Sequence, residues 1–131
     1  MVVLHVFVPL ATVLAWPERL FGIIPLVAGL AVAVTAKKQF ARLGTNVRTF
    51  NKPDMLVTDG LFRYTRNPMY LGFCLALAGI AMLLGSLSVI TAWLAFPLLV
   101  ARWYIRYEEN MMARTFGDDY LRYKSKVRAW L

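Results

Sequence analysis

Four apolar runs, separated by polar segments, dominate the hydropathy pattern of this sequence. They cover residues 2–16, 20–36, 69–84 and 87–105. The first two runs are joined by a short turn, and so are the last two, which predicts two helical hairpins. The first run is short for a membrane span, since about twenty residues are typical, and we expect a short or tilted helix there. It has neither the basic start nor the small-residue cleavage site of a secretory signal peptide.

Two further segments complete the pattern. Residues 37–67 form a polar connection, and we expect an ordered loop that packs on the helix ends. After the fourth run, Gly117 fits the end of one helix and Asp118 the N-cap of the next. Aromatic and apolar residues then recur at helical spacing, and the other side of this helix is charged and mainly basic, which predicts an amphipathic helix in the membrane interface. The spaced residues are Phe116, Tyr120, Tyr123, Val127 and Trp130.

The expected fold is therefore all-α, a single integral membrane domain over residues 1–131 with about four transmembrane helices. It divides into a first hairpin (1–40), a cytosolic loop (41–67), and a second hairpin with the C-terminal helix (68–131). Composition agrees, because 60% of the residues are hydrophobic and only 17% are charged, whereas soluble domains carry about 25% charged residues. The mean hydropathy of +0.57 is also high for a soluble protein.

The net charge of +8 is distributed unevenly. Arg19 lies in the first short turn, whereas the other fourteen Lys and Arg residues fall on the opposite side of the predicted four-helix topology. The positive-inside rule makes that side cytoplasmic, so both termini are expected in the cytoplasm. Since the basic residues flank apolar segments, we expect the lipid bilayer as a partner and no nucleic acid.

Two residue types limit the chemistry. Cys74 is the single cysteine and His5 the single histidine. A disulfide framework, a His/Cys metal centre and a Ser-His-Asp triad are therefore not expected.

The segment RYTRNPMYLG, residues 63–72, places polar side chains directly before the third apolar run. Asn67 suits an N-cap and Pro68 a first helical turn, so the step can simply begin a helix. Helix starts also expose unpaired N–H groups and a partial positive charge. With Arg66 alongside, this is a good site for a carboxylate or a phosphate.

A second polar cluster, ARWYIRYEENMM, continues the fourth run. Its arginines, Arg102 and Arg106, are expected either to snorkel to the surface or to take part in function. Arg106 and Glu109, three residues apart, are placed to pair. Glu108 and Glu109 are functional candidates, since carboxylates at a membrane boundary suggest recognition of a cationic group. The hairpin brings this cluster and the Arg66 cluster to one membrane face.

These motifs together resemble a known family. LVTDGLFRYTRNPMYLG, then an apolar hairpin, then RYEENMMARTFGDDYLRYKSKVRAWL are similar to the isoprenylcysteine carboxyl methyltransferase and phospholipid methyltransferase family over about residues 45–131. The resemblance implies an integral membrane methyltransferase that uses S-adenosyl-L-methionine, held in a cytosol-facing pocket of the C-terminal half. A lipophilic or lipid-modified acceptor would then enter sideways from the bilayer.

The resemblance also implies roles for residues 54–57, for an aromatic residue, for the Asn-Pro step, and for the first glutamate of the pair. Together with Arg66, which suits the cofactor's carboxylate, the expected cofactor-binding residues are Leu56, Val57, Phe62, Arg66, Asn67, Pro68, Met69, Tyr70 and Glu108. The expected substrate-binding residues are Arg102, Arg106 and Glu109. No catalytic residue and no metal ligand is assigned.

Two departures from the family pattern matter. Many relatives have His where this chain has Asn67, so any role that needs an imidazole is absent. The spacing of the arginines before the glutamates also differs from that in the eukaryotic prenylcysteine enzymes. This difference bears on the prenylcysteine substrate more than on the cofactor.

The reaction itself leaves alternatives open. A carboxylate acceptor needs no base, whereas an amine must lose a proton, and Glu109 is the only general-base candidate in sight. This favours transfer to a carboxylate, isoprenylcysteine-like or otherwise lipid-linked, or to a thiolate. The alternatives are a phospholipid or amine N-methyltransferase, an NADPH-binding membrane reductase, and a non-catalytic scaffold. A small transporter would need an acidic residue within a span, and the apolar runs between residues 20 and 99 contain none.

Overall fold

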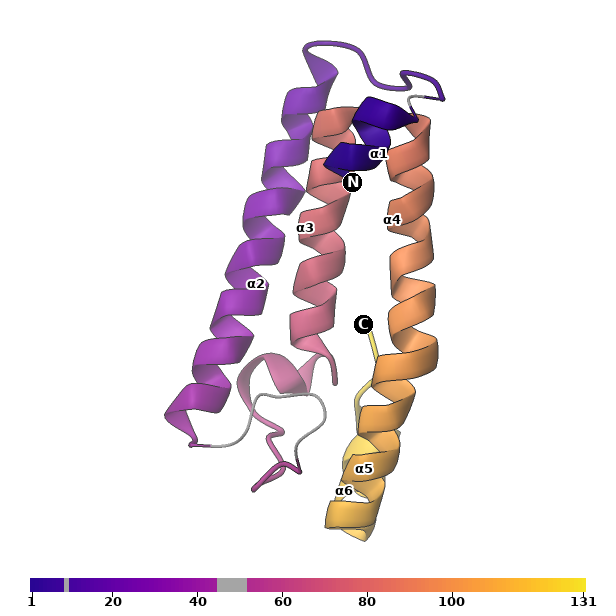
Figure 1. Ribbon diagram of the computed structural model, residues 1–131. Helices are drawn as coiled ribbons and strands as arrows, with labels where there is room; N and C mark the ends of the chain where they lie inside the picture. The colour runs from indigo at the N-terminus through magenta and orange to yellow at the C-terminus, as the bar shows by residue number, and fades with distance from the viewer. Residues whose placement is uncertain (9, 45–51) are drawn as a thin grey trace.

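Three long helices form the body of the molecule in the computed structural model, which describes residues 1–8, 10–44 and 52–131. They are α2 (Ile23–Arg42), α3 (Pro68–Leu84) and α4 (Leu87–Val100), and they lie side by side (Figure 1). Shorter helical segments complete the described chain: α1 (Val2–Phe7), η1 (Glu18–Gly22), η2 (Gly60–Arg63), η3 (Ala101–Ile105), α5 (Arg106–Phe116) and α6 (Asp118–Lys126). The all-α prediction is confirmed for the described residues.

Membrane spans are fewer than predicted. Two helical stretches of the described chain are long and apolar enough to cross a membrane, Glu18–Arg42 and Leu87–Phe116, and α3 is apolar but shorter. α1 has only six residues, about 9 Å of helix, and cannot cross a hydrocarbon core of about 30 Å. Four transmembrane helices are therefore not found among the described residues, and the predicted helix over residues 2–16 is wrong.

The first helix ends early for a local reason. Val8 has φ −136° and ψ 62° and precedes a proline in the sequence, which disfavours the α conformation. Farther along, Thr12 forms an antiparallel bridge with Ser86, and the N–H of Val13 donates to the carbonyl oxygen of Gly85 at 2.8 Å. Residues 11–13 therefore run along the turn between α3 and α4 instead of continuing a helix.

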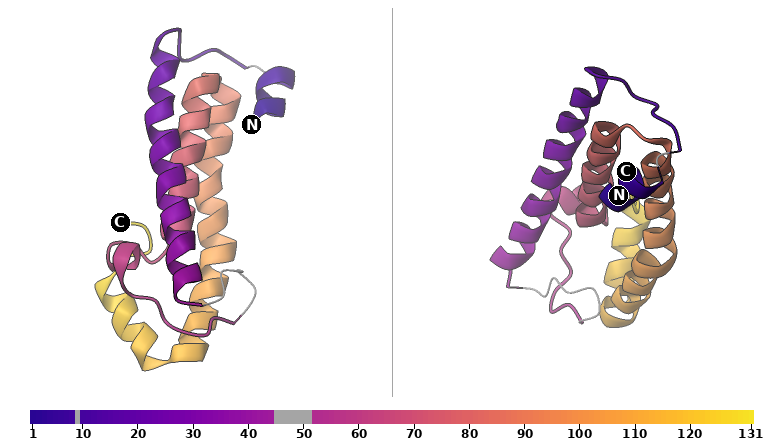
Figure 2. Two further views of the ribbon diagram at one scale, coloured as in Figure 1. Left: turned by 90° about the vertical axis from the view of Figure 1, so that its left-hand side faces the viewer. Right: turned by 45° about the horizontal axis from the view of Figure 1, so that its top comes forward.

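Residues 11–13 and Arg128 lie at opposite ends of α3. Residues 11–13 contact the turn that follows its last residue, whereas the carbonyl oxygen of Arg128 accepts a hydrogen bond from the N–H of Arg66, just before its first residue, at 2.9 Å. α1 contacts α4 and lies away from most of α2 (Figures 1 and 2). α1 thus packs on α4 instead of forming the first long helix of the predicted hairpin.

α2 and α3 pack with their backbones in contact, because their facing positions carry small residues. A Cβ atom added at Gly79 would lie 2.5 Å from the carbonyl oxygen of Gly22, and one added at Gly72 would lie 2.7 Å from that of Gly29. Membrane helices associate through close packing of this kind, since lipid provides no hydrophobic drive. The buried small residues that meet in these close approaches are Gly22, Gly29, Ala33, Gly72, Ala76 and Gly79.

α4 continues through the π-helical turn η3 into α5, so Leu87–Phe116 is one helix of 30 residues. The indole N–H of Trp93 donates to the carbonyl oxygen of Cys74 at 3.0 Å and joins α4 to α3. The predicted continuation of this helix past the apolar run is confirmed. It ends at Gly117, as predicted, where a φ of +55° favours glycine. Asp118 is the first residue of α6 rather than its N-cap, a position that Gly117 holds.

α6 folds back from Gly117 and buries its aromatic face inside the protein (Figure 2). Tyr120 and Tyr123 form a buried cluster with Val57 and Phe62. The amphipathic helix is confirmed, but its apolar face packs on the segment that contains η2 instead of lying in the membrane interface. The difference arises because periodicity shows that a face is apolar without showing which surface covers it.

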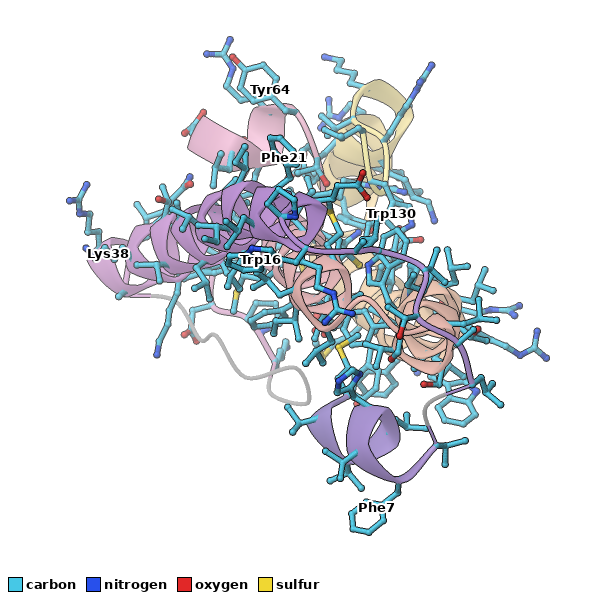
Figure 3. The ribbon with its side chains drawn as sticks, turned by 90° about the horizontal axis from the view of Figure 1, so that it is seen from above. Phe7, Trp16, Phe21, Lys38, Tyr64 and Trp130 are labelled. Atoms are coloured by element: carbon cyan, nitrogen blue, oxygen red, sulfur yellow. The ribbon has the colours of Figure 1, made fainter. Side chains whose placement is uncertain are left out.

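The outside of the molecule is apolar along the helices and basic at one end. Phe7 is 78% and Trp16 74% exposed, and both Phe7 and Lys38 point outward in Figure 3. Arg19 lies at the Gly85 end of α3, where its Nε donates to the carbonyl oxygen of Leu14 at 2.8 Å. Arg66 lies at the other end of α3, so the predicted separation of Arg19 from Arg66 is present among the described residues.

Candidate functional site

A cavity of about 190 Å³ lies where the start of α3, the α5 segment 108–112 and α6 meet. Its walls contain residues from both polar clusters that the sequence singles out, so the predicted convergence of Arg66 and Glu108 at one end of the molecule is confirmed. Nine of the twelve expected site residues line it: Val57, Phe62, Arg66, Asn67, Pro68, Met69, Tyr70, Glu108 and Glu109. The volume is below the roughly 300 Å³ of common small-molecule pockets, so a nucleotide must extend beyond it or displace a wall.

The other three expected residues lie outside the cavity. Leu56 packs, partly buried, against the cluster that contains Val57. Arg102 and Arg106 are exposed and do not line the cavity, and the π-helical turn η3 separates Arg102 from the regular helix that carries Glu108 and Glu109. The snorkelling alternative accounts for both arginines. Their expected substrate role has no support from this geometry.

The backbone at the start of α3 is held by the C-terminal segment. Asn67 occupies the N-cap position without a side-chain cap, and its Nδ2 donates instead to the carbonyl oxygen of Ala129 at 2.8 Å. The hydroxyl of Thr65 donates to the same oxygen at 3.1 Å. With the bond from Arg66 to Arg128, residues 128–129 form a strap across residues 65–67. The C-terminal strap therefore fixes the backbone that carries the Arg66 side chain.

Glu109 is bridged by two cations. Its Oε1 lies 2.8 Å from Nη2 of Arg66, and its Oε2 lies 2.8 Å from Nζ of Lys124. The side chains of Arg66 and Glu109 are only 10% and 18% exposed, so this pair is screened less than a surface salt bridge. The predicted pairing of Glu109 with Arg106 is wrong, because the carboxylate faces α6 and the start of α3.

Two nitrogen atoms of Arg66, Nε and Nη1, are buried without a hydrogen-bond partner among the described residues. A buried donor left unpaired costs about 1–3 kcal/mol, and more when it is charged. Arg66 also lines the cavity, so its guanidinium is a candidate donor for an oxygen acceptor bound there. A carboxylate or a phosphate matches a guanidinium best.

Glu108 faces the cavity from α5. Its Oε1 accepts a hydrogen bond from the hydroxyl of Tyr70 at 3.0 Å, which joins the first turn of α3 to α5. The ring of Tyr70 lies 6.5 Å from that of Tyr104. An ionised carboxylate has about four acceptor positions, so Glu108 can accept from a ligand as well.

Tyr120 and Tyr123 close the cavity from α6. Burial raises the pKa of Tyr120 to about 12, and the charge of Glu109 adds to this effect while Arg66 opposes it. Burial also raises the pKa of Tyr123, again against the influence of Arg66. The hydroxyl of Tyr123 donates to the carbonyl oxygen of Phe62 at 2.7 Å. Both phenols are therefore neutral walls of the cavity at physiological pH.

Eight residues of the cavity wall were not predicted as site residues. In the sequence, Tyr120 and Tyr123 stood out only as part of one face of a helix. Met111 and Met112 stood out only because they follow the glutamates. Four of the six methionines of the chain line the cavity, an enrichment that no local pattern reveals. The eight are Phe40, Pro53, Met55, Phe73, Met111, Met112, Tyr120 and Tyr123. Within the described part of the chain, no group of three or more His, Cys, Asp and Glu side chains is placed to hold a metal ion.

A family model described as phospholipid methyltransferase matches residues 17–119 of this chain. The chain belongs to that family. The match includes both polar clusters and ends just before Tyr120, so most of α6 and the C-terminal strap lie outside it. The resemblance inferred from the motifs is confirmed.

Three similar proteins carry the name of a protein-S-isoprenylcysteine O-methyltransferase. A protein-S-isoprenylcysteine O-methyltransferase of Schizosaccharomyces pombe is 36% identical over 97 residues, which are 72% of this chain and 39% of that protein. Protein-S-isoprenylcysteine O-methyltransferase A of Arabidopsis thaliana is 32% identical over 120 residues, which are 86% of this chain and 58% of that protein. A probable protein-S-isoprenylcysteine O-methyltransferase of Oryza sativa subsp. indica is 30% identical over 122 residues, which are 88% of this chain and 62% of that protein. The chain therefore spans between two fifths and two thirds of the length of these relatives.

Proposed function

We propose that this chain is a membrane-embedded methyltransferase that uses S-adenosyl-L-methionine and methylates a carboxylate on a lipid-linked, isoprenylcysteine-like acceptor. One observation carries the proposal. In a chain of the phospholipid methyltransferase family, Arg66 lines a cavity that Glu108 shares, and two nitrogens of its guanidinium are buried without a hydrogen-bond partner among the described residues. This is a donor set for an anionic group beside an acceptor for a cationic or hydroxyl group.

The residues of the cavity suit the cofactor group by group. Arg66 would hold its carboxylate, and Glu108 would accept from its ammonium or from a ribose hydroxyl. The rings of Phe62 and Tyr70 would cover the adenine or approach the sulfonium. When bound, S-adenosyl-L-methionine supplies a methyl group activated by the sulfonium. The apolar wall, with Met69 and Met112, would exclude water around the transferred group.

The state of Glu109 supports a carboxylate acceptor over an amine. Each of its oxygens takes part in an ion pair, one with Arg66 and one with Lys124. A carboxylate engaged in this way is poorly placed to take a proton from an amine. A carboxylate acceptor attacks without a base, and the names of the relatives give isoprenylcysteine as their acceptor.

The position of the cavity suits a bilayer substrate. It lies at the end of the helices that carries most of the basic residues, the end that the positive-inside rule assigns to the cytoplasm. Trp103, Tyr104 and Tyr107 are 65%, 42% and 46% exposed near this end, where they fit an aromatic belt at the membrane surface. A cofactor could arrive there from the cytosol and a lipid-linked acceptor from the bilayer.

Calorimetry on the full chain in detergent tests the cofactor. We expect S-adenosylhomocysteine to bind and NADPH not to bind. Arg66→Ala and Glu108→Ala should each weaken S-adenosylhomocysteine binding about ten- to a hundredfold, since a charged hydrogen bond is worth about 1.5–3 kcal/mol. Arg114→Ala, at an exposed position of α5, is the matched control. NADPH binding in place of S-adenosylhomocysteine, or normal binding by both variants, would contradict the proposal.

Methyl transfer from a labelled donor tests the acceptor. We expect label on a farnesylated cysteine analogue with a free carboxylate, in a form that base hydrolyses as an ester. The same cysteine thioether with a methyl group in place of the prenyl chain should accept little label. Base-stable label on phospholipid amines would favour the N-methyltransferase alternative, and equal labelling of the two thioethers would remove the lipid requirement.

A further inference from the structure

The structure assigns Glu109 and Lys124 as positioning residues that couple the docking of α6 to the orientation of Arg66. This inference rests on the proposed function, because Arg66 is taken there as the group that holds the cofactor's carboxylate. It replaces the expected substrate role of Glu109. It also extends the site to Lys124, which lies outside residues 17–119 matched by the family model.

The first step concerns how Arg66 is held. Its Nη2 is committed to Oε1 of Glu109 at 2.8 Å, whereas Nε and Nη1 have no partner among the described residues. One nitrogen thus fixes the plane of the guanidinium, and two nitrogens remain for a ligand. A free arginine side chain has many rotamers, and holding one of them in advance lowers the entropy lost on binding. Glu109 therefore acts on the ligand through Arg66.

The second step concerns the other oxygen of Glu109. Lys124 reaches it from α6, across the turn at Gly117, at 2.8 Å. The same helix places Tyr120 and Tyr123 in the cavity wall. Docking of α6 therefore closes the cavity and completes the pair of cations on Glu109 in one movement. If α6 undocks, Glu109 loses one of its two anchors and Arg66 loses its fixed orientation.

The cavity volume is the reason to expect that α6 moves when a ligand binds. About 190 Å³ is too small for a whole nucleotide, so the cofactor must extend beyond the cavity or displace one of its walls. If a wall is displaced, α6 is the candidate, since Gly117 alone joins it to the long helix and hydrogen bonds alone tie the C-terminal strap after it to residues 65–67. The bond from the Tyr123 hydroxyl to Phe62 and the Lys124–Glu109 pair then re-form over the bound ligand.

Two ligands separate positioning from a general loss of structure. S-adenosylhomocysteine carries the carboxylate that Arg66 would hold, whereas 5′-methylthioadenosine lacks the amino-acid part. We expect Glu109→Gln and Lys124→Met to weaken S-adenosylhomocysteine binding about tenfold and 5′-methylthioadenosine binding less than about twofold. Lys124→Arg should restore binding. Lys126→Met, an exposed lysine of the same helix, is the matched control.

Each outcome is informative. Equal losses for both ligands would show that Glu109 and Lys124 merely support the fold, and wild-type binding by Lys124→Met would remove the coupling. Both results leave the proposed function intact. No binding of S-adenosylhomocysteine by the wild-type chain would instead overturn the proposed function and this inference together. If Glu109→Gln fails to fold, Lys124→Met carries the test, because Lys124 is 42% exposed and its replacement is tolerable.

Discussion

Two regions along α3 differ in how their contacts are made. On one side of the helix, the stretch from Gly72 to Gly79 meets α2 through small residues, with backbones close enough that an added Cβ would overlap. At its first turn, the same helix opens a cavity with ion pairs, a tyrosine–carboxylate bond and unpaired guanidinium nitrogens. In the first region, the buried atoms of the two helices are stabilised by close packing against one another. The second leaves two buried nitrogens of Arg66 without a partner among the described residues, and the proposed ligand would bind beside them.

Within the short helix α3, we therefore expect one side to contribute mainly to stability and the first turn to contribute mainly to binding. The α2–α3 pair provides a rigid support, and the support determines where Arg66 and Tyr70 stand. The cavity wall opposite them is assembled from α5 and α6, which are held by ion pairs, by hydrogen bonds and by the buried cluster around Tyr120 and Tyr123. We therefore expect changes in the α2–α3 contact to affect folding, and changes in the cavity to affect binding with smaller effects on stability.

The largest effect is expected for Gly29→Leu. A side chain at this position would overlap the backbone of Gly72 and Ala76, and overpacking costs about 1–3 kcal/mol or more. Since no flexible side chain can move away here, we expect about 3 kcal/mol or more and loss of the monodisperse protein after mild heating, measured by size exclusion in detergent. Ala28→Leu, at the exposed neighbouring position, should behave as the wild type. Equal stability of the two variants would break the comparison.

A smaller effect is expected for Tyr123→Phe in the cavity region. The change removes the donor to the carbonyl oxygen of Phe62, and one hydrogen bond contributes about 0.5–1.5 kcal/mol. We expect the free energy of unfolding to fall by about this amount, measured by thermal unfolding in detergent. Tyr64→Phe is the control, since Tyr64 is 72% exposed. A loss of unfolding free energy as large as that for Gly29→Leu would mean that the cavity region contributes as much to stability as the α2–α3 contact.

The smallest effect concerns pH. The pKa of Tyr120 is raised from 10.0 to about 12 in the folded chain, so folding favours the neutral phenol. Its contribution to stability is complete below pH 10 and is lost as the pH rises toward about 12. We expect thermal unfolding at pH 11 to occur at a lower temperature than at pH 9, with a smaller shift for Tyr120→Phe. An identical shift in the two proteins would show that the phenol is not buried in the folded state.

The sequence determined those features that depend on neighbours in the chain. The apolar runs predicted α3 and the long helix that continues through α5. The conformational freedom of glycine predicted the end of the long helix at Gly117. The convergence of Arg66 with Glu108 followed from a tight hairpin, since two helices joined by a short turn must bring the start of one beside the end of the other. The motifs around these residues were sufficient for the family.

Tertiary structure alone decided the partners of each charge and each apolar face. Nothing local joins Glu109 to Lys124 rather than to Arg106, or aims Tyr120 and Tyr123 at Phe62 rather than at lipid. The first apolar run likewise met the turn at Gly85 instead of crossing as a helix. These choices depend on which surfaces are free once α2, α3 and α4 have packed, and a periodic pattern records that a side is apolar or charged without recording what will lie against it.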